Sequence, residues 1–166
     1  LKGKQVGIIG TGRIGKAVCE VLTKLGARVS AYDIQPDVLW AKTHSILYVS
    51  LESLLSVSDI ISLHASVGGG TEAIIREREV SKMKKGVMII NTSRGCLIDE
   101  QAVYEALHSG QIGSLGIDVY ETEPYEGNLV EFENVLLTPH IATFTRESRL
   151  EMEVQATQNL LNVLGA

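Results

Sequence analysis

The sequence predicts a single α/β domain built on a doubly wound parallel sheet of about seven strands, with helices on both faces. Short apolar runs alternate with segments of helical spacing along the whole chain. Most of these runs are apolar at every position, which is typical of strands that are buried on both faces. The chain has 166 residues, a length that suits one compact domain, and no linker or low-complexity segment divides it.

Composition excludes several classes of protein. Hydrophobic residues make up 45% and charged residues 21% of the chain, which argues against disorder. The net charge of −5 argues against a basic surface that would bind nucleic acid. No apolar run is long enough to cross a membrane, and nothing resembles a signal peptide. Cys19 and Cys96 form no CxxC pair, so we expect no disulfide framework, no metal site and a reducing, cytoplasmic location.

The first unit is a strand, a glycine-rich turn, a helix and a second strand. The apolar run over 5–9 predicts a buried strand. Residues 13–25 have helical spacing, and Gly26 is suited to end a helix because glycine takes the left-handed conformation at little cost. Residues 27–32 predict the second strand, which ends at Asp33. The apolar side of the helix consists of Ile14, Val18, Val21, Leu22 and Leu25.

The same alternation continues to the end of the chain. Further strands are predicted over 46–49, 60–64, 87–91, 115–119 and 135–138. Helices are predicted over 51–57, 76–84, 99–109 and 145–164, the last with Thr145 as its N-cap. Three consecutive glycines at 68–70 interrupt the pattern, because glycine has too much backbone freedom for regular structure.

The glycine-rich turn matches the GxGxxG pattern of dinucleotide-binding proteins as Gly10-Thr11-Gly12-Arg13-Ile14-Gly15. The pattern alone is weak, but here it follows a strand and opens a helix. Gly10 permits a tight turn, Gly12 lets the backbone approach a pyrophosphate, and Gly15 lets the helix pack against the strand. The helix would offer free N–H groups to the phosphates, so its first residues, Arg13 and Ile14, are assigned to the same site.

Asp33 completes this fingerprint, because an acidic residue at the end of the second strand accepts hydrogen bonds from the adenosine ribose. Its negative charge would repel a 2′-phosphate. The unit therefore predicts a Rossmann-type domain that binds NAD in preference to NADP.

The second half of the chain carries four further motifs. They are Asn91-Thr92-Ser93-Arg94-Gly95, Leu97-Ile98-Asp99-Glu100, Gly116-Ile117-Asp118-Val119-Tyr120-Glu121-Thr122-Glu123-Pro124 and Thr138-Pro139-His140-Ile141-Ala142. This series resembles the NAD-binding domain of the D-isomer-specific 2-hydroxyacid dehydrogenases, over essentially all 166 residues. The resemblance implies reversible hydride transfer between NADH and a small 2-oxo acid, which gives a D-2-hydroxy acid.

The resemblance also implies three catalytic residues, each placed after a strand. Arg94 would bind the substrate carboxylate and polarise the 2-oxo group, a task that suits a planar guanidinium. His140 would be the general acid in reduction and the base in the reverse direction. Glu123 would hold the second ring nitrogen of His140 and favour the imidazolium. Strands of an open parallel sheet place such residues at one edge, where ligands bind.

Further cofactor contacts follow from the same resemblance. Asp118 would contact the nicotinamide amide, and Thr92 and Ser93 would line the cleft beside it. The loop after the fourth predicted strand would pass along the cofactor with Ala65, Ser66 and Thr71. In the family this loop reads His-x-Pro-Leu-Thr, whereas here the proline is lost and three glycines stand before Thr71. His64 has either a structural or a functional role, and no role is assigned to His44, His108, Cys19, Cys96 or Trp40.

A second, flavodoxin-like substrate domain flanks the NAD domain in the family, and this chain lacks both of its parts. We therefore expect residues 1–166 to be the NAD domain alone, to bind NAD(H) and to turn over 2-oxo acids poorly or not at all. The resemblance implies a homodimer joined through the NAD domain.

Two functions remain open at this point, an enzyme domain and an NAD(H)-sensing corepressor or scaffold of the same fold. The intact set of Arg94, Glu123 and His140 favours the enzyme. The substrate also remains open: residues 118–121 resemble D-lactate dehydrogenases, whereas 139–142 resemble the glycerate and phosphoglycerate branch.

Overall fold

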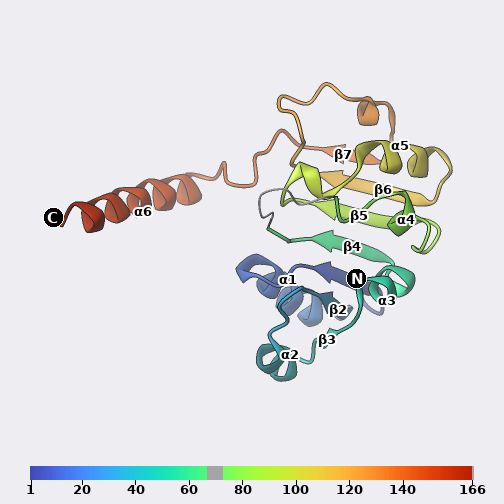
Figure 1. Ribbon diagram of the computed structural model, residues 1–166, viewed down its shortest axis with the longest axis horizontal. Coiled ribbons are helices and arrows are strands. Elements are labelled where there is room, and N and C mark those ends of the chain that lie inside the picture. Colours follow the sequence, from blue (N-terminus) through green and yellow to red (C-terminus); the bar gives the residue numbers. More distant parts are fainter. Residues whose placement is uncertain (67–72, 166) are drawn as a thin grey trace.

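The strands form one seven-stranded parallel sheet in the order β3-β2-β1-β4-β5-β6-β7 in the computed structural model, which describes residues 1–66 and 73–165 (Figure 1). The strands are β1 Gln5–Ile9, β2 Arg28–Tyr32, β3 Leu47–Tyr48, β4 Ile60–Leu63, β5 Val87–Asn91, β6 Ile112–Ile117 and β7 Val135–Leu137. The helices are α1 Arg13–Lys24, α2 Val38–His44, α3 Leu51–Val57, α4 Glu77–Val80, α5 Glu100–His108 and α6 Arg146–Leu164, with 3-10 turns at Gly95–Leu97 and Asn128–Glu131. The predicted doubly wound α/β class is confirmed.

Most predicted elements lie within a few residues of the observed ones, and α2 is the helix that the sequence analysis missed. It begins after Asp37, whose side chain accepts a hydrogen bond from the Trp40 N–H, and ends at Ser45 in the left-handed conformation. The segment is too short to show a helical repeat, so the capping residue was the available signal. The helix expected over 76–84 is shorter, because α4 ends at Val80. Strand β6 begins at Ile112, three residues before the predicted start.

Two apolar clusters lie on the two faces of the sheet, because successive side chains of a strand point to opposite faces. Ile8 of β1 packs with α1 and α2 in one cluster. Ile9, the next residue, packs with α3, α4 and α5 in the other. Over β5–β7 the helices of the described chain cover only the face that packs with α3, α4 and α5. On the opposite face, the side chains of Met88 and Leu136 are 38% and 68% exposed.

Helix α1 buries only part of the apolar side that the sequence analysis identified. Ile14, Val21 and Leu25 are exposed, and the buried residues of the helix are Gly15 and Cys19. The helix approaches the sheet through these small residues, and Val18 and Leu22 are partly buried against the same apolar cluster. The C-terminal helix α6 starts at the predicted N-cap, buries none of its residues and points away from the sheet (Figure 1).

The sheet order changes direction between β1 and β4. The chain moves outward from β1 to β2 and β3, then crosses back to β4 on the other side of β1. The loops that follow β1 and β4 therefore leave the sheet in opposite directions, which opens a crevice at their carboxyl ends.

Candidate active site

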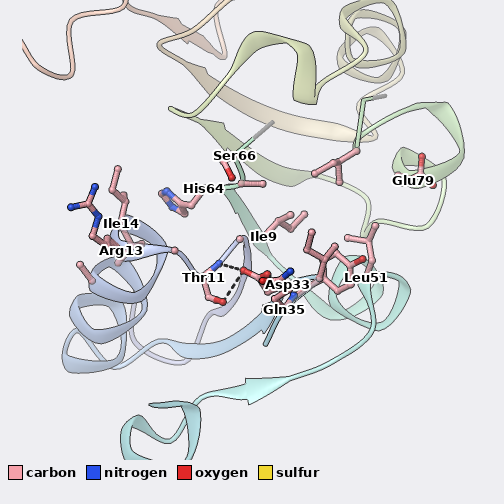
Figure 2. A pocket seen from close by; sticks show the side chains of 18 of the residues that line it. Ile9, Thr11, Arg13, Ile14, Asp33, Gln35, Leu51, His64, Ser66 and Glu79 are labelled. Carbon is pink, nitrogen blue, oxygen red and sulfur yellow. Dashed lines mark hydrogen bonds between the residues drawn. The ribbon is translucent and has the colours of Figure 1, made fainter. Parts of the chain in front are cut away.

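A cleft of about 1710 Å³ occupies the crevice at the ends of β1 and β4 (Figure 2). The glycine-rich turn and the first turn of α1 form one wall, and the residues that follow β4 form another. The residues at the end of β2 also line the cleft. The predicted cofactor residues that line the cleft are Gly10, Gly12, Arg13, Ile14, Asp33, Ala65 and Ser66.

The three glycines of the turn have different surroundings. Gly10 has a φ of 93°, and a Cβ there would lie 2.5 Å from the Ala65 nitrogen. A Cβ at Gly15 would lie 2.0 Å from the Gly10 carbonyl oxygen. A Cβ at Gly12 would meet no atom within 4 Å, so the backbone there is open to the cleft. Because no side chain caps α1 at Gly12, the first N–H groups of the helix face this opening.

Asp33 is fixed by its own chain at the edge of the cleft. One carboxylate oxygen accepts the Thr11 N–H at 2.6 Å and the Thr11 hydroxyl at 2.9 Å, as Figure 2 shows. The other oxygen accepts the Gln35 N–H at 2.9 Å. Partial burial raises the pKa of Asp33, but the hydrogen bonds from Gln35 and Thr11 outweigh it, so the pKa lies below its usual range. The carboxylate is therefore charged at neutral pH.

The sequence analysis named no role for three further residues of the cleft and left the role of His64 open. Thr11 occupies a position that the glycine pattern leaves unspecified, and Ile34 and Gln35 come directly after Asp33. His64 also lines the cleft, with its Nε2 2.9 Å from the Ser62 hydroxyl. Burial lowers the pKa of His64, which favours the neutral ring at neutral pH.

Glu123 and His140, which follow β6 and β7, lie in direct contact. The His140 Nδ1 lies 3.1 and 3.0 Å from the two carboxylate oxygens of Glu123. The hydrogen bond with His140 lowers the pKa of Glu123, so the carboxylate is ionised at neutral pH. With Nδ1 facing Glu123, the Nε2 atom is on the opposite edge of the ring, and the His140 side chain is 50% exposed.

Asp118 anchors the segment that carries His140. Its buried carboxylate accepts the Thr138 hydroxyl at 2.5 Å and the backbone N–H groups of Ile141 and Ala142 at 3.0 and 3.1 Å. Burial raises the pKa of Asp118, but these three hydrogen bonds outweigh it and hold the pKa below its usual range. Asp118 thus binds residues on both sides of His140.

Tyr120 joins the two loops and was missed by the sequence analysis. Its hydroxyl donates to the Thr138 carbonyl at 2.9 Å, and its backbone N–H donates to Glu123 at 3.2 Å. No local pattern marks such a contact, because it spans 18 residues of chain.

Arg94 lies in a turn at the end of β5 that is held by the buried Asn91. The Asn91 side chain donates to the Arg94 carbonyl at 2.9 Å and accepts the Ser93 N–H at 3.1 Å. The Arg94 guanidinium is exposed and donates to the Ser93 carbonyl. Among the described residues, no hydrogen bond or ion pair joins Arg94 to Glu123 or His140.

The turn that carries Arg94 nevertheless packs against the loop that carries Glu123. A Cβ at Gly95 would lie 2.1 Å from the Tyr120 carbonyl carbon, so only glycine allows this approach. The Ser93 hydroxyl donates to the Leu63 carbonyl at 2.6 Å, which ties the same turn to the end of β4.

The remaining predicted residues lie outside the lining of the cleft. Gly15 packs behind the turn, and Thr71 lies outside the described residues. The predicted residues near the ends of β5, β6 and β7 do not line the cleft, and these are Thr92, Ser93, Arg94, Asp118 and His140.

Within residues 1–66 and 73–165, no group of three or more His, Cys, Asp or Glu side chains is arranged to hold a metal ion. No helix in this part of the chain has the length and apolar character needed to span a membrane.

Comparisons with known proteins agree with this geometry. The model of the D-isomer specific 2-hydroxyacid dehydrogenase NAD binding domain matches residues 1–142. A hydroxypyruvate reductase of Blautia hydrogenotrophica is 43% identical over 162 residues, which cover 96% of this chain and 50% of that protein. A glyoxylate reductase of Aeropyrum pernix is 40% identical over 163 residues, which cover 97% of this chain and 49% of that protein.

Solved structures give the same result. The apo-structure of D-lactate dehydrogenase from Escherichia coli has a TM-score of 0.88 and 43% identity, over 99% of this chain and 51% of that one. An NAD-complexed D-isomer specific 2-hydroxyacid dehydrogenase from Lactobacillus delbrueckii has a TM-score of 0.86 and 32% identity, over 98% of this chain and 54% of that one. The chain therefore spans about half the length of the relatives that it matches.

Proposed function

Because this chain belongs to the D-isomer specific 2-hydroxyacid dehydrogenase family and matches its NAD-binding domain, we propose that it is the cofactor half of an enzyme that reduces a small 2-oxo acid to a D-2-hydroxy acid. The observation that carries this proposal is the Glu123–His140 pair, which follows strands of the same parallel sheet whose β1 and β4 ends hold the cleft. A histidine held by a carboxylate is suited to give and take one proton in each catalytic cycle.

The residues of the cleft fit NAD(H). The open backbone at Gly12 and the uncapped start of α1 would receive the pyrophosphate. Asp33 would accept the ribose hydroxyls, and Ala65 and Ser66 would lie along the opposite side. When bound, NADH supplies the hydride. The protein's own residues bind the two reactants and move the proton.

His140 would donate the proton from Nε2 to the oxygen of the 2-oxo group during reduction. Glu123 would hold the ring through Nδ1 and so keep Nε2 directed away from the carboxylate. In the reverse direction, the neutral Nε2 would accept the proton of the 2-hydroxyl. Arg94 would bind the substrate carboxylate with its planar guanidinium and polarise the 2-oxo group. Thr92 and Ser93, in the same turn, would face the nicotinamide, and so would Asp118.

We also propose that a second domain supplies the rest of the substrate site. The relatives are about twice as long as this chain, which supports this division. The 166-residue chain would then bind NAD(H) but reduce 2-oxo acids slowly or not at all.

A homodimer and a cytoplasmic location complete the proposal. Helix α6 exposes large apolar side chains such as Leu150, Leu160 and Val163, which are a candidate contact surface. Both cysteines are free thiols, which suits a reducing compartment. Light scattering of the purified protein would measure its mass in solution.

The proposal is tested in two steps. The 166-residue chain is titrated with NADH, and tight saturable binding is expected. A panel of 2-oxo acids, including pyruvate, glyoxylate and hydroxypyruvate, is then assayed with NADH on a chain that includes the proposed second domain. Turnover of none of the panel, together with intact NADH binding, would instead favour the NAD(H)-sensing alternative.

A further inference from the structure

We propose that Tyr48 is a positioning residue that fixes Asp33, through the hydroxyl of Thr11, in the orientation that selects NADH over NADPH. The inference rests on the proposed cofactor site and adds two residues to the part of it that discriminates between the cofactors. Tyr48 is not among the residues that line the cleft, so it would act without touching the ligand.

A chain of three hydrogen bonds leads from the backbone to Asp33. The Asp37 N–H donates to the Tyr48 hydroxyl at 3.2 Å. The hydroxyls of Tyr48 and Thr11 lie 2.7 Å apart. The Thr11 hydroxyl donates to the Asp33 carboxylate at 2.9 Å, as Figure 2 shows for this last bond.

The direction of the chain follows from what each group can do. The Asp37 N–H can only donate, and an ionised carboxylate can only accept. Since the proton of Thr11 is given to Asp33, the bond between the two hydroxyls must carry the Tyr48 proton to Thr11. All three donors therefore point toward Asp33, and bonds aligned in one direction strengthen each other.

The fold brings these residues together across three strands. Tyr48 ends β3 and is paired with Ala31 of β2, two residues before Asp33. Thr11 follows β1 and is only 5% exposed, so its side chain has little freedom to rotate. Since β2 lies between β1 and β3, the two hydroxyls meet at the carboxyl end of β2.

The same tyrosine holds the other end of the loop that follows Asp33. At residue 37, the backbone N–H bonds to Tyr48 and the carboxylate forms an ion pair with Lys16 at 2.5 Å. Both ends of the loop over 33–37 are thus attached to one hydroxyl network. We infer that this loop, including the exposed Ile34, is set in place before the cofactor arrives.

The hydrogen bonds that the Asp33 carboxylate already accepts limit where a further donor can bind. One oxygen already accepts two bonds from Thr11 and the other accepts one from Gln35. The oxygen that faces Gln35 accepts one of these bonds whereas the other oxygen accepts two, so the first retains capacity for a further donor. A ribose hydroxyl can donate there. A 2′-phosphate would instead meet a negative charge that cannot turn away without breaking its bonds to Thr11.

The test uses the 166-residue chain itself, titrated with NADH and with NADPH by calorimetry. The variants are Tyr48→Phe and Thr11→Val, which remove one hydroxyl each and keep the shape. We expect each to reduce the ratio of the NADPH to the NADH dissociation constant by roughly three- to tenfold, the range expected for one hydrogen bond. Thr11→Ser, which retains the hydroxyl, should restore the ratio.

Tyr104→Phe is the matched control, because the Tyr104 hydroxyl also bonds to a carboxylate, that of Glu131, but does not line the cleft. It should leave the ratio unchanged. Equal weakening of both cofactors in Tyr48→Phe and Thr11→Val, or no change, would overturn the inference. Tighter NADH binding would also do so, since it would mean that Thr11 competes with the ribose. A wild-type chain that binds no NADH would overturn the proposed function instead.

Circular dichroism of every variant establishes that it is folded. If Tyr48→Phe does not fold, the comparison of Thr11→Val with Thr11→Ser decides the question, because both act at the same position and differ in the hydroxyl.

Discussion

The hydroxyl of Thr138 donates a 2.5 Å hydrogen bond to the buried carboxylate of Asp118. Two residues further along the chain, His140 has a φ of 53°, in the left-handed region that costs a side chain other than glycine about 1 kcal/mol. Asp118 also accepts the N–H groups of Ile141 and Ala142. His140 is therefore held in an unfavourable backbone conformation by bonds that its neighbours make to one carboxylate.

Asp118→Asn should destabilise the chain. An asparagine can accept with only one of its two side-chain atoms, so its NH₂ group would face the donors of Thr138 and Ile141 or the N–H of Ala142. A buried donor left without an acceptor costs about 1–3 kcal/mol. Urea unfolding at neutral pH measures the loss, with the exposed Glu126→Gln as a control that should change little. An unchanged midpoint for Asp118→Asn would contradict the anchoring role.

The stability that Asp118 contributes should depend on pH. Its pKa in the folded chain lies below the usual value, so the unfolded chain takes up the proton first as the pH falls. The contribution is present above about pH 4 and is lost as the pH falls through the folded pKa. The difference in unfolding free energy between wild type and Asp118→Asn should therefore be largest near neutral pH and shrink below about pH 4. A difference in unfolding free energy that grows as the pH falls would contradict this prediction.

His140→Gln should abolish turnover while NADH binding is retained. Glutamine keeps a polar side chain but cannot act as a general acid, a role that contributes about a hundredfold or more to the rate. Glu123→Gln should leave part of the activity, because the ring stays in place but loses its charged partner. The measurements are kcat on a chain that includes the proposed second domain and NADH affinity on the 166-residue chain. Wild-type turnover in His140→Gln would rule out this assignment.

Gly12→Ala and Gly15→Ala should separate cofactor binding from folding. A Cβ at Gly12 meets nothing in the protein, so this variant should keep its stability and lose NADH affinity, because the methyl group takes the place of the pyrophosphate. A Cβ at Gly15 would lie 2.0 Å from a backbone oxygen, so Gly15→Ala should lose both stability and NADH affinity. Gly116→Ala, whose Cβ would lie 4.0 Å from Ile90, is the control that should keep both. Thermal unfolding and NADH titration together distinguish these outcomes.

Asp33→Ala should narrow the preference for NADH over NADPH. The substitution removes the charge that would repel the 2′-phosphate and the acceptor for the ribose. The ratio of dissociation constants should fall further than in Tyr48→Phe, since the network acts only through Asp33. An unchanged ratio in Asp33→Ala would argue against a ribose contact.

The sequence was sufficient for the seven strands, for each described helix except α2 and for the glycine-rich turn. These features depend on local rules, because apolar spacing determines which element forms and a tight turn before a helix demands glycine. The bounds of β1, α3 and β5 could be predicted for this reason.

Only the tertiary structure decided which side chains meet. The outward direction of Ile14 and Val21 depends on how closely α1 approaches the sheet at Gly15. The bonds from Asp118 to Thr138 and from Tyr48 to Thr11 join residues 20 and 37 positions apart. Such contacts follow from sheet order and register, and no periodicity in the sequence records them. The sequence by itself thus determined the strands, most helices and the glycine-rich turn, whereas the packing of neighbouring strand ends decided how the polar side chains between them are held.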